Sequence, residues 1–176
     1  MRRSVSAHAL SALMLIAVSV FVVGFDQLTK RWVLATLPEG GWWSPLPGEA
    51  WRFFRITHAT NSGAAFGIFP NQGSFFILVA VVVVIAIILY YRHLPAGDLL
   101  LRLSLGLQLG GAIGNLVDRL RFGYVIDFID VGFWPIFNIA DASISIGVIL
   151  IACCLWRGDR TTAVARPGMV DKEVQS

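Results

Sequence analysis

The sequence predicts an all-α membrane protein with four transmembrane helices and a small β or interfacial subdomain between the first two. Of the 176 residues, 56% are hydrophobic and 14% are charged, and the mean hydropathy is +0.72. Soluble domains carry about 25% charged residues. The apolar residues form long blocks rather than amphipathic stripes, which indicates a chain solvated by lipid. The length fits a single domain.

Four apolar stretches are long enough to cross a bilayer as helices, which takes about 20 residues. They cover about 9–28, 73–91, 99–116 and 139–156. The third is the weakest, because it contains Arg102, Gln108 and Asn115. The first could also be a signal peptide, but its uncharged stretch is longer than a typical h-region and no A-x-A-like cleavage site follows. We therefore expect it to remain as a transmembrane helix.

An even number of spans places both termini on one side of the membrane. Eight Lys and Arg residues lie near that side, which includes the loop 92–98, and six lie near the other. Basic residues are enriched on the cytoplasmic side, so the count favours cytoplasmic termini. We expect one membrane domain over 1–157 and a polar, disordered cytoplasmic tail over 158–176. The net charge of +3 is too small and scattered to indicate nucleic acid binding.

The segment between the first two spans, residues 31–72, is rich in Trp, Pro and Gly and is expected to form an outer platform. A short strand is predicted within it at about 51–57. Trp42, Trp43 and Trp51 suit the membrane interface, where amphipathic rings lie at the level of the lipid headgroups.

Small residues recur every four positions in the third span, at Gly106, Gly110 and Gly114. Such a stripe lets a second helix approach closely. The two cysteines, Cys153 and Cys154, are neighbours in the fourth span; adjacent residues make a poor disulfide, and two cysteines do not make a zinc site. No metal or organic cofactor is predicted.

Polar residues gather at the outer ends of the spans and in the outer loops. They are Asp26, Lys30, Asn61, Asn115, Asp118, Arg119, Asp127, Asn138 and Asp141. Ionisable groups at membrane depth are costly and are usually functional. Asp26 and Lys30 share one helix face, as a structural ion pair or as an anchor near a substrate headgroup. Asp118 and Arg119 are interpreted as a structural pair, which Asn115 joins.

Asp127 and Asp141 lie in apolar surroundings, with no cation within four residues of either. The intervening Gly132 and Pro135 allow a turn that brings the two carboxyl groups to one depth. Two facing carboxyl groups in a low-dielectric site cannot both ionise. One can then activate a water molecule while the other protonates a peptide carbonyl. The alternative is a helix cap at Asp141 and a salt bridge in the loop at Asp127 or Asp130.

The sequence contains neither H-E-x-x-H nor G-x-S-x-G, which would indicate other hydrolytic chemistry. The run Asn61–Gly67, just before the second span, combines an Asn with small residues. Such a run suits a tight turn or a loop that binds a substrate backbone closely.

Four separated motifs make the chain, over roughly residues 15–155, similar to the lipoprotein signal peptidases (signal peptidase II). The motifs are DQLTK at 26–30, NSGAAFGIF at 61–69, GGAIGNLVDRLRFGYVIDFID at 110–130 and FNIADASISIG at 137–147. The resemblance implies a bacterial aspartyl endopeptidase with four spans, cytoplasmic termini and an active site near the outer leaflet of the inner membrane. It implies that the substrates are prolipoproteins with a diacylglyceryl cysteine, cut just before that cysteine.

When the family motifs are matched to this sequence, the resemblance implies that the catalytic residues are Asp127 and Asp141. The supporting and substrate-binding positions fall on Asp26, Lys30, Asn61, Gly63, Asn115, Asp118, Arg119, Asn138 and Ala140. The interval between the two aspartates is short beside that of some family members, which we expect to trim the loop and not the catalytic pair. We expect a monomer whose partners are the lipidated substrates and membrane lipid.

The main alternative function is a small proton-coupled transporter or a lipid-binding membrane protein. Carboxyl groups near a glycine-rich helix would serve such a protein equally well. Transporters more often place charges near the midplane and show internal repeats, and this sequence shows neither.

Overall fold

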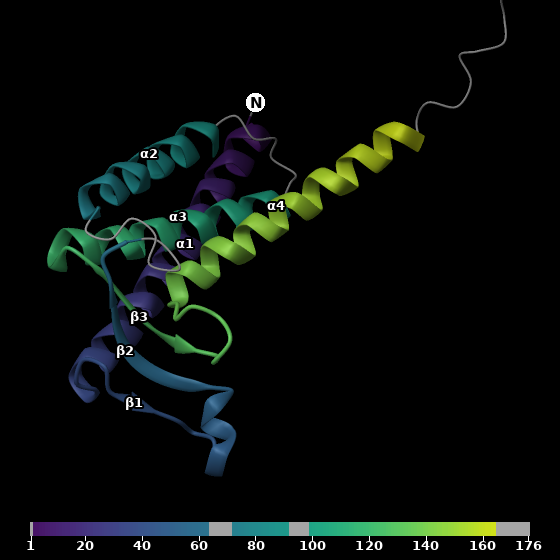
Figure 1. Cartoon of the computed structure of the whole chain (residues 1–176). Helices are drawn as coiled ribbons and strands as arrows, with labels where there is room; N and C mark the ends of the chain where they lie inside the picture. The colour runs from purple at the N-terminus through teal and green to yellow at the C-terminus, as the bar shows by residue number, and fades with distance from the viewer. Residues whose placement is uncertain (1, 64–71, 92–98, 165–176) are drawn as a thin grey trace, which may run out of the picture.

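The computed structural model describes residues 2–63, 72–91 and 99–164, and it is mostly helical (Figure 1). The elements in chain order are α1 (Arg2–Thr36), β1 (Trp42–Trp43), the 3-10 helix η1 (Gly48–Arg52), β2 (Arg55–Asn61), α2 (Gly73–Tyr91), α3 (Leu99–Phe122), β3 (Val125–Asp130) and α4 (Ile139–Val164). In this part of the chain, four helices are long and apolar enough to cross a membrane. The four predicted spans are therefore confirmed.

Three helices extend further than the sequence predicts. The helix α1 continues to Thr36, just before Pro38, and α3 continues to Phe122, where Gly123 adopts a φ of 84° and its N–H bonds back to the Arg119 carbonyl at 3.0 Å. Glycine at such a position is a common helix end. The helix α4 reaches Val164, past the predicted start of the tail at 158. The loop 92–98, the remainder of the Asn61–Gly67 run and the tail 165–176 lie outside the described residues.

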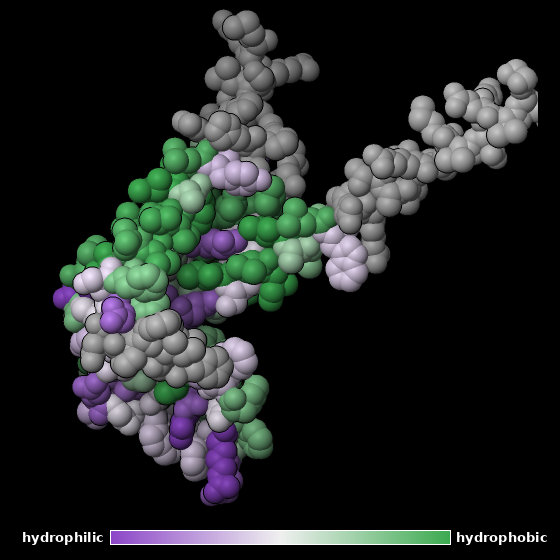
Figure 2. Space-filling view, turned by 45° about the horizontal axis from the view of Figure 1, so that its top comes forward, coloured by the Kyte–Doolittle hydropathy of each residue, from purple (hydrophilic) through white to green (hydrophobic). Residues whose placement is uncertain are grey.

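Helix α3 is the centre of the bundle and packs against α1, α2 and α4. In its most apolar window 56% of the residues are buried, against 6% in α2, whose mean hydropathy is 3.0. A helix with polar residues is therefore enclosed, and the most apolar helix is left on the outside. Figure 2 shows hydrophobic side chains covering the helices, with hydrophilic ones gathered at the end that carries the sheet.

The predicted glycine stripe lies at helix contacts. A Cβ atom on Gly106 would lie 2.9 Å from Val18 of α1, and one on Gly110 would lie 2.7 Å from Val22. On the α4 side, a Cβ atom on Gly111 would overlap the carbonyl oxygen of Ala140. These glycines let the backbones approach closely, as predicted.

The predicted platform is an antiparallel sheet in the order β1-β2-β3. The predicted strand at 51–57 is displaced, because Trp51 belongs to η1 and β2 begins at Arg55. The sheet is also not confined to the segment between the first two helices. Its third strand, β3, follows α3 and pairs Asp127 with Ala59, which satisfies the second edge of β2 with main-chain hydrogen bonds.

The tryptophans of the platform form an aromatic cluster. Trp42 stacks on Trp51 with ring centroids 5.2 Å apart, and the guanidinium of Arg55 lies over both rings. Trp42 and Trp43 remain half exposed. Half-exposed tryptophan rings agree with the predicted position at the membrane interface.

The glycine at the α3–α4 contact gives a prediction on stability. Gly111→Ala should destabilise the protein by about 1–3 kcal/mol, because the added methyl group meets main-chain atoms that cannot rotate away. Thermal unfolding in detergent, followed by tryptophan fluorescence, measures the loss. Gly24→Ala is the matched control, since a Cβ atom there meets nothing within 4 Å. Equal Tm values for the two variants would contradict the proposed contact.

Candidate active site

The loop between β3 and α4 folds back on itself, so the residues before and after it lie together. Ile129 and Phe137 form an antiparallel bridge with main-chain hydrogen bonds of 2.8 and 3.1 Å. Inside the loop, Gly132 has a φ of 78°, which glycine adopts without strain. Asp127 precedes the bridge in β3, and Asp141 follows it in the first turn of α4. Both side chains line one cavity.

Asn138 caps the N-terminus of α4. Its side-chain Oδ1 accepts a hydrogen bond from the main-chain N–H of Asp141 at 2.9 Å, and its main-chain carbonyl accepts one from Ala142 at 3.1 Å. An Asn at this position is a favourable cap. The alternative in which Asp141 caps the helix is therefore wrong, and the Asp141 carboxyl group faces the cavity instead.

The cavity has a volume of about 720 Å³ and joins a polar wall to an apolar one. Its polar wall consists of Asn61, Gly63, Asn115, Arg119, Asp127 and Asp141. The apolar wall is provided mainly by the loop 131–137 and by the first turns of α4. The remaining predicted site residues, Asp26, Lys30, Asp118, Asn138 and Ala140, are absent from this lining and lie behind the polar wall.

Two amide groups hold the carboxyl group of Asp127, which is only 3% exposed. Asn138 donates to Oδ1 at 2.7 Å and Asn61 donates to Oδ2 at 3.0 Å. Burial raises the pKa of Asp127 to about 7, and the nearby charge of Asp141 adds to the rise. The two amides and Lys30 act in the opposite direction. A carboxyl group with this pKa exchanges its proton near neutral pH, as an acid–base catalyst must.

Asp141 receives a hydrogen bond from Asn115, whose Nδ2 donates to Oδ1 at 2.7 Å. Its position in the first turn of α4 also favours an anion, because main-chain N–H groups point outward there. The two aspartates are thus held by donors from β2, α3 and the cap of α4. Within the described residues, no group of three His, Cys, Asp or Glu side chains could hold a metal ion.

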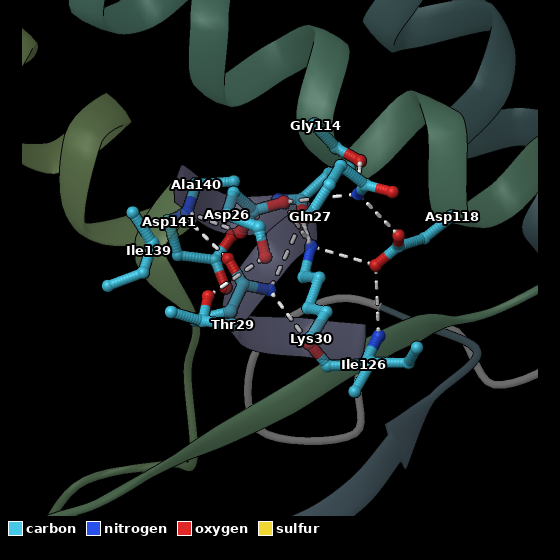
Figure 3. Close-up of polar contacts among 12 residues, drawn as sticks. Asp26, Gln27, Thr29, Lys30, Gly114, Asp118, Ile126, Ile139, Ala140 and Asp141 are labelled. Atoms are coloured by element: carbon cyan, nitrogen blue, oxygen red, sulfur yellow. Dashed lines mark hydrogen bonds and ion pairs between the residues drawn. The ribbon is translucent and has the colours of Figure 1, made fainter. Parts of the chain in front are cut away.

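Behind the polar wall lies a buried ion triad, drawn in Figure 3. The Lys30 Nζ atom lies 2.8 Å from Asp26 Oδ2 and 2.7 Å from Asp118 Oδ2, and all three side chains are almost completely enclosed. Lys30 also donates to Asn115 Oδ1 at 3.1 Å. The predicted Asp26–Lys30 ion pair is confirmed. Asn115, which was expected to join Asp118 and Arg119, instead bonds to Lys30, Asn138 and Asp141.

The predicted pairing of Asp118 with Arg119 is wrong. Consecutive helical residues point about 100° apart, so the two side chains of α3 face different neighbours. Asp118 turns towards Lys30, whereas Arg119 turns to the cavity, where its Nη2 donates to the Gly63 carbonyl at 3.3 Å. The same guanidinium lies over the ring of Phe76, 5.2 Å from its centroid.

The salt bridge considered for the loop belongs to Asp130, which pairs with Arg55 of β2. The sequence interpretation did not single out Gln27, although its Nε2 donates to Asp118 Oδ1 at 2.8 Å and to the Gly114 carbonyl at 3.2 Å. Gln27 directly follows Asp26 in an apolar span, and this could have indicated a role, because an enclosed amide needs hydrogen-bond partners within the protein.

The fold and the cavity define a helical membrane protein with a pair of aspartates that accept hydrogen bonds from neutral amides in one cavity, an arrangement that suits hydrolysis by acid–base chemistry. The family model described as signal peptidase (SPase) II matches residues 18–157. The lipoprotein signal peptidase of Moorella thermoacetica is 47% identical over 133 residues, covering 76% of this chain and 86% of that protein. The corresponding protein of Staphylococcus aureus is 38% identical over 144 residues, with coverages of 80% and 86%.

A solved bacterial membrane enzyme has the same fold. It aligns with a TM-score of 0.78 at 35% identity, covering 92% of this chain and 94% of that one. The chain belongs to the signal peptidase II family, aspartic peptidases that remove signal peptides from prolipoproteins. Because the chain belongs to a peptidase family, the alternative function as a transporter or a lipid-binding protein is not supported.

The raised pKa of Asp127 predicts how stability depends on pH. The folded-state pKa of about 7 lies above the ordinary value of 3.8 for an aspartate, so the protonated side chain favours folding below pH 4 and this contribution is lost as the pH rises through 7. The side chain in Asp127→Asn cannot ionise. The Tm of this variant minus that of the wild type should therefore be more positive at pH 8 than at pH 5. Thermal unfolding in detergent at the two pH values tests this, and an identical Tm difference at both would contradict it.

Proposed function

We propose that Asp127 and Asp141 are the catalytic pair with which this enzyme hydrolyses its substrate, a prolipoprotein with a diacylglyceryl cysteine, just before that cysteine. The observation that supports this proposal is their shared cavity. Both carboxyl groups line it, each is held by an Asn amide, and no cation forms an ion pair with either in the described part of the chain.

In the proposed reaction, one carboxylate takes a proton from a water molecule as that water attacks the scissile carbonyl. The other carboxyl group gives its proton to the carbonyl oxygen, which forms a neutral tetrahedral intermediate. The carbon–nitrogen bond then breaks. The departing amine takes up a proton from the first group, and the intermediate returns its hydroxyl proton to the second, so the pair regains its starting state.

The other predicted residues divide into two proposed roles. Asn61, Asn115 and Asn138 direct the two carboxyl groups through the hydrogen bonds described above. Gly63 and Arg119 form the part of the wall that can contact a substrate backbone, and Arg119 adds a positive charge there. Asp26, Lys30, Asp118 and Ala140 support the site from behind. The apolar wall of the cavity is the proposed contact for the lipid part of the substrate.

We further propose that the protein is a monomeric, multi-pass protein of the bacterial cytoplasmic membrane, with cytoplasmic termini and the active site near the outer leaflet. The beginning of α1 and the end of α4 both lie at the end of the bundle away from the sheet (Figure 1). The excess of basic residues at that end supports a cytoplasmic location for it. In this proposal residues 1–157 act as one domain.

Removal of either acid should stop the reaction. Asp127→Asn and Asp141→Asn should each lower kcat by about 10²–10⁴-fold, since a neutral amide can neither take nor give the proton. Purified variants are assayed on a diacylglyceryl-modified prolipoprotein. The control is Asp130→Asn, which removes a carboxylate from the same strand at the side of Arg55. Wild-type activity in Asp127→Asn or in Asp141→Asn would overturn the assignment of these aspartates as the catalytic pair.

The substrate part of the proposal is tested with one prolipoprotein prepared with and without the diacylglyceryl group on its cysteine. We expect cleavage of the modified form and no detectable cleavage of the unmodified form, because the apolar wall would lose its contact. Mass spectrometry of the products locates the cut. Equal rates on the two forms would exclude the lipid as a recognised group and leave the aspartate assignment unaffected.

A further inference from the structure

Lys30 is one of the most buried side chains in the described structure, at 1% exposure, and it forms an ion pair with neither active-site aspartate. It lies between the carboxylates of Asp26 and Asp118, so the triad carries one net negative charge. Enclosing three charges is costly, and a purely apolar contact of the same size would often be as stable or more so. The triad is therefore expected to serve more than stability.

The two carboxylates of the triad hold the backbone next to each active-site aspartate. Asp26 Oδ1 accepts the main-chain N–H of Ala140 at 3.0 Å, directly before Asp141 in the sequence. Asp118 Oδ2 accepts the main-chain N–H of Ile126 at 3.2 Å, directly before Asp127. Figure 3 shows Lys30 between these two arms. The ammonium group thus joins the two points that position the aspartates.

Lys30 also sets the direction of an amide. Asn115 Oδ1 accepts hydrogen bonds from Lys30 at 3.1 Å and from Asn138 at 3.2 Å. An amide oxygen can face donors, whereas its NH₂ group cannot. With two donors on Oδ1, Nδ2 of Asn115 must point the other way, and it donates to Asp141.

We propose that Lys30 is a positioning residue of the active site, which through Asp26, Asp118 and Asn115 fixes the placement of Asp127 and Asp141. The inference rests on the proposed catalytic roles of these two aspartates. The charge of Lys30 then also affects how firmly the pair holds its proton. Removing a positive charge from the triad strengthens proton binding by the pair, and removing a negative charge weakens it.

The charged groups that face the pair come from two helices, α1 and α3. They are Asp26 and Lys30 of α1 and Asp118 and Arg119 of α3, and in addition Asp127 and Asp141 face each other. Asp130 is paired with Arg55, and the described residues of α2 include no charged side chain. Of the cations, Lys30 is the one enclosed between carboxylates, so its replacement changes the field on the pair without opening the cavity.

The test is the pH profile of kcat/KM for the full-length enzyme on a diacylglyceryl-modified prolipopeptide. In Lys30→Gln the acid limb should move up by roughly 0.5–1 pH unit. Misplacement of the pair should lower kcat by about 100-fold with a smaller change in KM. In Asp118→Asn, which keeps an oxygen for the Ile126 N–H, the limb should move down. Arg31→Gln is the matched control, because Arg31 is the next residue of α1 and is exposed; its profile should remain that of the wild type.

Lys30→Gln leaves two buried carboxylates without a cation, which destabilises the fold, so a second variant keeps the test decisive if the first does not fold. The double variant Lys30→Gln/Asp118→Asn restores the net charge of the triad to that of the wild type. Its acid limb should therefore return towards the wild-type position while kcat stays low. Unshifted limbs in both folded variants, or a wild-type kcat in the double variant, would overturn the positioning role. Activity in Asp127→Asn or Asp141→Asn would instead overturn the proposed catalytic pair.

Discussion

The structure depends on keeping one ammonium group enclosed at the end of the helix bundle that carries the sheet. A lysine that cannot reach water must be neutralised by the protein itself. Lys30 finds its partners on α1 and α3, and these partners in turn hold α4 and β3 through main-chain N–H groups. One charge therefore fixes the relative positions of three helices and a strand, where lipid offers no hydrophobic force between the helices.

Much of the fold could be predicted from the sequence because hydropathy is a local property. The four spans were found in the right places, and so was the glycine stripe of α3. Helix ends were less predictable, since α1 and α3 continue until Pro38 and Gly123 interrupt them. The sheet was predicted incompletely, because the pairing of β2 with β3 joins segments separated by two helices, and no local pattern encodes such a partner.

The site shows the same division between local and distant information. Apolar surroundings pointed to Asp127 and Asp141, and both line the cavity. The choice of ionic partner was predicted wrongly for Asp118, since sequence neighbours on a helix point in different directions while Lys30 approaches from another helix. Gln27 was overlooked for a related reason, because its contacts on α3 exist only once the two helices have packed.

The Ile129–Phe137 bridge separates two tasks within one short stretch of chain. It ties the chain together next to both aspartates, so the segment beyond it, from Val131 to Ile136, does not have to hold them in place. That segment supplies much of the apolar wall of the cavity. The length and the side chains of this loop can consequently change the shape of the cavity without displacing Asp127 or Asp141.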